Sequence, residues 1–158
     1  MTTQQAKEGL RKIETAEKLL IGLTQKQKVD LCLYAVCYFY KNVTVQTDNT
    51  QKIKLLIDRI DALNCKSQNR AKYKSIVLES AEVVKKIKKS ATDQTTIIYK
   101  IAQLAYDMSI AATSSSDATS TKYAQYVIYY ALKFSGNKII DDLAKIKEFL
   151  ITEEIIQN

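Results

Sequence analysis

The order of hydrophobic and polar positions predicts helices along almost the whole chain. Apolar residues recur three and four positions apart, which is the spacing of one face of an α-helix. The predicted helices span residues 3–21, 25–41, 50–64, 68–89, 94–112, 122–135 and 138–156. Seven helices, or six if two of them merge, favour an all-α, compact single-domain bundle over residues 1–158.

One stretch lacks the polar positions of a surface helix. Residues 31–40 are ten consecutive apolar residues, from Leu31 to Tyr40. Thr24 and Gln27 precede this stretch with the spacing of a capping box, so it reads as a helix and not as a strand. We therefore predict a buried apolar helix near 29–40. The segment 123–134 is nearly as apolar, and both are candidates for the middle of the bundle.

The predicted connections follow from turn and cap residues. Gly22 is placed to end the first helix, and Gly136 is placed to end the helix at 122–135. Residues 42–49 have no helical pattern, and Asp48 or Asn49 is the predicted cap of the next helix. Residues 90–93 provide a further N-cap. Residues 113–121 are nine residues rich in serine and threonine, which is typical of an exposed, mobile loop.

The composition supports long helices and removes several kinds of chemistry. Proline is absent and glycine occurs three times, so helix breakers are scarce. Histidine is also absent, which excludes imidazole-dependent triads and histidine-ligated metal sites. The glycines are isolated, so no glycine-rich phosphate loop is present. We expect no cofactor, no metal site and no enzymatic activity.

The remaining candidate catalytic groups have ordinary structural explanations. Asp58 and Asp61 could share a helix face, but charges three apart are common on solvated helices. Cys32 and Cys37 lie in the most apolar stretch, where we expect small core residues. Cys65, next to a lysine at a helix end, is the one thiol with a setting that could make it reactive.

Three further observations predict a cytoplasmic protein without membrane contact. The cysteine count is odd and the thiols are widely spaced, which suits a reducing compartment. The first residues lack the apolar region of a secretory signal. The longest apolar run is half of the ~20 residues that a membrane-spanning helix needs.

The basic residues are concentrated on one predicted helix. The chain has a net charge of +7, and residues 66–89 hold eight basic residues against two acidic ones. The helix is predicted to bury one apolar side, made of Tyr73, Ile76, Val77, Val83, Val84 and Ile87. On a helical wheel, five of the basic residues gather on the face opposite Ile76, Val83 and Ile87, and Lys66 and Lys86 flank them. The predicted partner-binding strip, called the basic strip below, consists of Lys66, Arg70, Lys74, Lys85, Lys86, Lys88 and Lys89.

The basic strip has three interpretations. It could be a solvated face that only keeps the protein soluble. It could dock an acidic protein surface, as an adaptor, an inhibitor or antagonist, or a small subunit of an assembly would. It could also contact nucleic-acid phosphates without choosing sequence, because lysine dominates the strip. We expect a non-enzymatic binding module with an acidic protein partner, and nucleic-acid binding is the alternative.

Ten tyrosines and the last helix add two further hypotheses. Tyr34 and Tyr38 are one turn apart, as are Tyr126 and Tyr130, which fits either the edge of a core or a recognition surface. The segment 138–156 carries apolar residues at alternating spacings of four and three. This seam could pack in the monomer or make a homo-oligomer.

Overall fold

Seven helices and no strand make up residues 2–157, the part of the chain whose backbone the computed structural model describes; side chains are described for residues 2–153. The all-α prediction is confirmed. The helices are α1 (Thr3–Leu20), α2 (Gln25–Tyr40), α3 (Asp48–Asn64), α4 (Arg70–Ser90), α5 (Ile97–Thr113), α6 (Asp117–Ser135) and α7 (Ile140–Gln157).

Local sequence signals set most helix ends. Thr24 and Gln27 form the predicted capping box at the start of α2. Gly22 and Gly136 follow the ends of α1 and α6 with φ values of 82° and 63°. This left-handed conformation closes a helix and costs glycine no Cβ clash, so both glycines act as predicted.

Two predicted helix starts were wrong by a few residues. The cap of α3 is Thr47, whose hydroxyl accepts a hydrogen bond from the backbone N–H of Thr50, and not Asp48 or Asn49. The cap of α5 is Thr96, because Asp93 instead accepts hydrogen bonds from Thr95 within a preceding turn. A threonine and an aspartate can each cap a helix, so the pattern did not identify which residue does so.

The predicted mobile loop at 113–121 is mostly helical. Only residues 114–116 connect α5 to α6, and α6 begins at Asp117 with Ser116 as its cap. Ser120 is buried and donates to the carbonyl of Ala111 at 2.6 Å. Gln25 of α2 also donates to the carbonyls of Ala111 and Ser114 and to the hydroxyl of Ser120. The polar composition of this segment is typical of a loop, but its side chains form hydrogen bonds that join the end of α5 to the start of α6.

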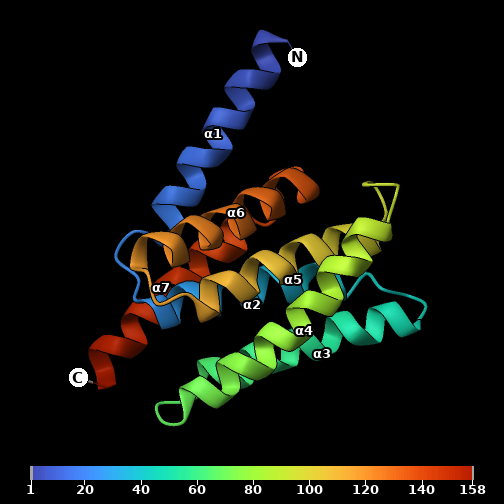
Figure 1. Cartoon of the computed structure of the whole chain (residues 1–158). Coiled ribbons are helices and arrows are strands. Elements are labelled where there is room, and N and C mark those ends of the chain that lie inside the picture. Colours follow the sequence, from blue (N-terminus) through green and yellow to red (C-terminus); the bar gives the residue numbers. More distant parts are fainter. Residues whose placement is uncertain (1, 158) are drawn as a thin grey trace.

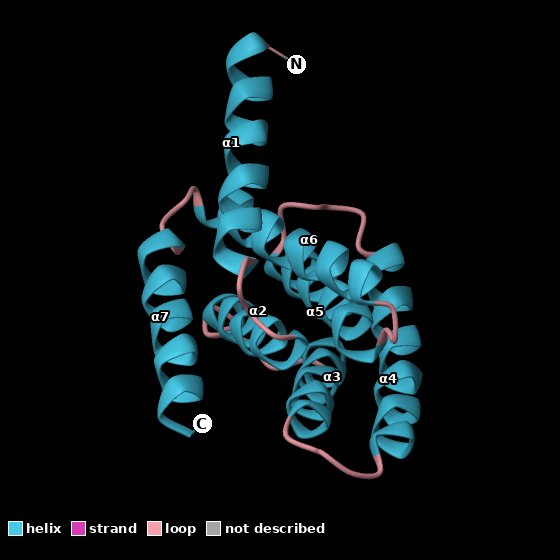
Figure 2. Ribbon diagram, turned by 90° about the vertical axis from the view of Figure 1, so that its left-hand side faces the viewer, coloured by secondary structure: helices cyan, strands magenta, loops and turns pink. Residues whose placement is uncertain are grey.

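The helices α3, α4, α5 and α6 pack each against the next, and α2 packs against α3, α5 and α6 (Figures 1 and 2). α5 contacts α2, α3, α4 and α6, and α2 contacts α3, α5, α6 and α7. The predicted buried helix near 29–40 is confirmed in α2, which buries seven apolar residues. α6, the second candidate for the middle, keeps a solvent-facing side, so α5 and α2 form the centre.

α7 packs its apolar side against the bundle. Ile139, just before α7, and Leu143 are buried in the core, and Ile146 and Leu150 pack against it. Gln27 of α2 also donates to the carbonyl of Leu150 at 3.1 Å. The seam of 138–156 is therefore used within the chain up to residue 151. The side chains of residues 154–156 lie outside the described part.

Candidate interaction surface

The basic strip lies along one flank of α4, beside the packed side of the helix. The buried residues of α4 are Val77, Ser80, Ala81, Val84 and Ile87. Val77, Val84 and Ile87 are buried as predicted, but the centre of the packed face is rotated from the predicted one toward Ser80 and Ala81. Val83, expected in the core, is 38% exposed. The strip is consequently next to the core-facing side and not opposite to it.

Small residues explain this rotation. Ser80 and Ala81 are buried although neither is strongly hydrophobic, and Arg59 of α3 donates a hydrogen bond to the Ser80 hydroxyl. Short side chains let two helix backbones approach closely, whereas Ile76 and Val83 are bulkier and lie toward the edge. The pattern of large apolar residues therefore identified Val77, Val84 and Ile87 correctly, but it placed the centre of the packed face too far toward Val83.

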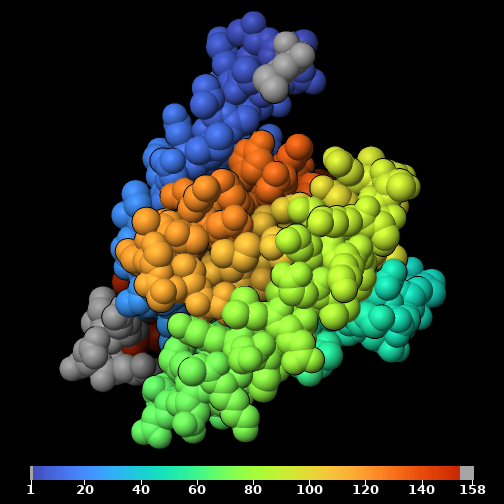
Figure 3. Space-filling model, viewed as in Figure 1, coloured from blue at the N-terminus to red at the C-terminus, as the bar shows by residue number. Residues whose placement is uncertain are grey.

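The strip residues are accessible to different degrees. Lys66, Lys86 and Lys89 are exposed, whereas Arg70, Lys74, Lys85 and Lys88 are half-buried. α4 and the neighbouring faces of α5 and α6 share one side of the molecule (Figure 3). A partner that approaches this side can reach the strip without displacing another helix.

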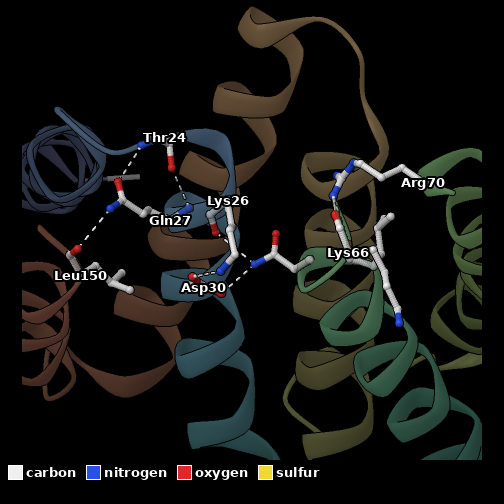
Figure 4. Close-up of polar contacts among 9 residues, drawn as sticks. Thr24, Lys26, Gln27, Asp30, Lys66, Arg70 and Leu150 are labelled. Atoms are coloured by element: carbon white, nitrogen blue, oxygen red, sulfur yellow. Dashed lines mark hydrogen bonds and ion pairs between the residues drawn. The ribbon is translucent and has the colours of Figure 1, made fainter. Parts of the chain in front are cut away.

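Arg70 already has a structural role. Its Nη1 atom donates to the carbonyl of Leu63 at 3.1 Å and to the carbonyl of Lys66 at 2.8 Å (Figure 4). These carbonyls lie at the end of α3 and in the turn after it. At a helix C-terminus the last C=O groups lack intrahelical N–H donors. Arg70 thus fixes the α3–α4 joint, and its guanidinium is less free for a partner than the lysines are.

Two strip lysines lie over tyrosine rings. The Lys66 Nζ atom is 5.1 Å from the centre of the Tyr73 ring, and the Lys88 Nζ atom is 5.9 Å from the centre of the Tyr106 ring on α5. At these distances a ring face attracts an ammonium group. The contacts orient both lysines, and neither has a carboxylate oxygen within 4.0 Å among described side chains. The Lys88 contact also shows that the strip follows the α5 side of α4.

The strip divides into two clusters with an apolar residue between them. Lys66, Arg70 and Lys74 surround the start of α4, and four lysines occupy its last two turns. Lys74 and Lys85 are eleven residues apart, about 16 Å along a helix. Leu78 lies between them on the same flank and is 49% exposed. Leu78 was not among the predicted site residues, although an apolar residue aligned with lysines four and seven positions away was a detectable signal.

The strip lysines differ from the lysines that do form ion pairs. Lys26, Lys52 and Lys54 each pair with an aspartate one helical turn away. Among described side chains, no residue of the strip lies within 4.0 Å of a carboxylate oxygen. Lys88 and Lys89 are favoured by the helix dipole at the end of α4, which is an intramolecular reason for two of the seven charges.

The other candidate groups do not assemble a reactive site. Asp58 is paired with Lys54 and lies exposed on α3. Cys32 is buried as predicted, but Cys37 is exposed, so the prediction that both are core residues was wrong for Cys37. This cysteine lies on the side of α2 that carries Tyr34 and Tyr38, which the other helices leave partly open. Cys65 is exposed as well.

Asp107 is a buried acid that the sequence analysis did not single out. It is 4% exposed in α5, and its carboxylate accepts a hydrogen bond from Gln103 at 2.6 Å. Burial raises the pKa of Asp107 to about 6, opposed by the Gln103 hydrogen bond and by the charge of Lys88. An acidic residue within an otherwise apolar helix was the available signal. Its enclosure leaves it no access to a substrate.

Most tyrosines line the edge of the core. Tyr34, Tyr38, Tyr123 and Tyr130 are half-buried and pack against it, as do four others. Tyr126 is the most exposed tyrosine among the described residues, at 38%. The core-edge interpretation therefore holds for these positions, whereas Tyr126 remains a candidate for a recognition surface.

Within the described residues, no helix has the length and hydrophobicity needed to cross a membrane, and no three metal-binding side chains cluster. Comparisons of the chain with protein-family models, with curated proteins and with solved structures found no match.

Proposed function

We propose that this protein is a non-enzymatic binding module that docks an acidic protein surface through the basic strip on α4. The observation that carries the proposal is the set of strip lysines without a carboxylate partner among described side chains. Unpaired cations on one flank steer an acidic partner and fix its orientation. The module would serve as an adaptor, an antagonist or a small subunit of an assembly.

The spacing of the strip limits the shape of the partner. Two cationic clusters about 16 Å apart, with Leu78 half exposed between them, match a surface that has two acidic patches and an apolar contact in the middle. Interfaces combine an apolar centre with a polar rim in this way. Leu78 is then the expected centre of the contact.

Arg70 favours a protein partner over a nucleic acid. Arginine gives bidentate contacts to phosphates and to guanine, but the only arginine of the strip donates to the carbonyls of Leu63 and Lys66. The remaining lysines could still bind a phosphate backbone without sequence preference. This alternative predicts an affinity that falls steeply as salt rises and that does not depend on Leu78.

A charge-reversal experiment tests the proposal. The variant Lys74→Glu/Lys85→Glu/Lys89→Glu should lose the partner that the wild-type protein captures from extracts of its native host. The control Lys41→Glu/Lys138→Glu/Lys145→Glu changes the net charge equally at exposed positions away from α4 and should retain that partner. A partner that survives the α4 reversal would show that the strip is only a solvated face.

A matched leucine pair separates the two partner classes. Leu78→Ala should weaken binding of a captured protein at least tenfold, whereas Leu55→Ala, a leucine on α3 of similar exposure, should not. Random-sequence DNA and RNA are titrated at low and high salt in parallel. Tight binding of these nucleic acids that falls steeply with salt and ignores Leu78→Ala would favour the nucleic-acid alternative.

A further inference from the structure

The first half of α1 carries an apolar surface that the rest of the chain does not cover. This part of the helix projects beyond the bundle (Figures 1 and 2). Leu10 is 61% exposed and Ile13 is 44% exposed, and the first buried residue of α1 is Ala16. An isolated helix of about twelve residues is marginally stable in water, so a partner for this face would stabilise it.

The apolar surface of α1 continues onto α6. Ile13 and Ala16 form one side of an open groove of about 290 Å³. Its other side comes from α6 and includes Tyr126 and Tyr129. Leu10 extends the same face of α1 one turn beyond the groove, and Ala6 lies a further turn along. The exposed leucine, isoleucine and tyrosine therefore form a single surface.

We propose that this surface binds a second copy of the chain, with the two α1 helices packed antiparallel. Ala6, Leu10 and Ile13 follow the alternating spacing of four and three that defines a coiled-coil seam. In an antiparallel pair, Leu10 of one copy lies opposite Ile13 of the other, and the two-fold axis repeats the contact. Gly9 lies beside this layer, and nothing in its own chain would contact a Cβ there, so the helices can approach closely.

The charges beside the seam select a second copy and its direction. Lys7 and Glu14 occupy equivalent positions one heptad apart on the same side of the seam. An antiparallel pair sets Lys7 of each copy beside Glu14 of the other. Both side chains are exposed and form no ion pair with a described residue of their own chain. A parallel pair would place Glu14 beside Gly9 and match no charge.

Sedimentation equilibrium over a range of protein concentrations tests the pairing. The contact is small, so we expect a monomer–dimer equilibrium with a micromolar dissociation constant. Leu10→Glu should make the protein monomeric without unfolding it, because Leu10 is largely outside the monomer's core. The control Leu55→Glu changes an exposed leucine on α3 and should leave the dimer intact.

A charge swap tests the register. Lys7→Glu should weaken dimerisation about tenfold, because each of two attractive pairs becomes repulsive. Adding Glu14→Lys to Lys7→Glu should restore wild-type dimerisation. A wild-type protein that stays monomeric up to millimolar concentration would overturn the proposal. A dimer that persists in Leu10→Glu would also overturn the proposal. So would a Lys7→Glu/Glu14→Lys variant that dimerises no better than Lys7→Glu.

Discussion

The buried carboxylate of Asp107 should make the protein less stable at neutral pH than at mildly acidic pH. The pKa of Asp107 is about 6 in the folded protein, against 3.8 for the unperturbed group. Between these two values the folded state binds more protons at this site than the unfolded state does. The free energy of unfolding therefore falls as the pH rises through this window and stays level above it.

The size of the effect follows from the two pKa values. Their difference corresponds to a loss of about 3 kcal/mol once Asp107 is ionised in both states. At pH 4.5 about 1 kcal/mol of this loss is already present, so about 2 kcal/mol remains to be lost by pH 7.5. That is a large share of the 5–15 kcal/mol that typically stabilises a domain.

The variant Asp107→Asn isolates this contribution. Its amide oxygen can still accept the hydrogen bond from Gln103, but the side chain no longer ionises. The free energy of unfolding is measured by urea denaturation at pH 4.5 and pH 7.5 for both proteins. Relative to the wild type, the variant should gain about 2 kcal/mol between the two pH values.

Asp61→Asn is the control, because Asp61 is exposed on α3 and its removal changes the net charge equally. The comparison between pH values removes any constant cost of placing an amide in the core. An equal difference between Asp107→Asn and the wild type at both pH values would refute the reasoning. That result would mean that water or Lys88 stabilises the ionised carboxylate inside the bundle.

Further predictions concern the α3–α4 joint, a helix end and the thiols. Arg70→Ala should lower the free energy of unfolding by about 1–2 kcal/mol in urea denaturation, since two carbonyl oxygens at the end of α3 lose a charged donor. Gly136→Ala should cost about 1 kcal/mol by the same assay, because its φ of 63° strains a Cβ atom. Alkylation of the native protein should modify Cys65 first, then Cys37, whose pKa is raised chiefly by burial, and Cys32 only after unfolding. Rapid labelling of Cys32 without unfolding would contradict its enclosure in the core, where burial strongly raises its pKa.

The sequence predicted the helices well because their signals are local. Helical spacing, the Thr24 capping box and the two glycine ends act within one or two turns of the chain. The connection at 113–121 was mispredicted because its polar residues bond to helix ends that are distant in sequence, such as Gln25 of α2. A serine in a turn and a serine that joins two helices have the same local pattern.

The candidate surface was only partly predictable. Composition located the cations on α4, but the side of the helix that packs depended on Ser80 and Ala81 and on the approach of α3. The structural role of Arg70 could not be seen either, because it needs the end of α3 to lie next to the start of α4. Hydrophobic patterns rank positions by transfer free energy, whereas close helix packing also rewards small residues.

The position of α2 has a consequence for synthesis of the chain. Its apolar residues are covered mainly by α5 and α6, which follow it by more than fifty residues. At a synthesis rate of about 5–20 residues per second, the apolar residues of α2 would stay exposed to solvent for several seconds. The nascent polypeptide is therefore most prone to aggregate, and most in need of a chaperone, just before its second half emerges.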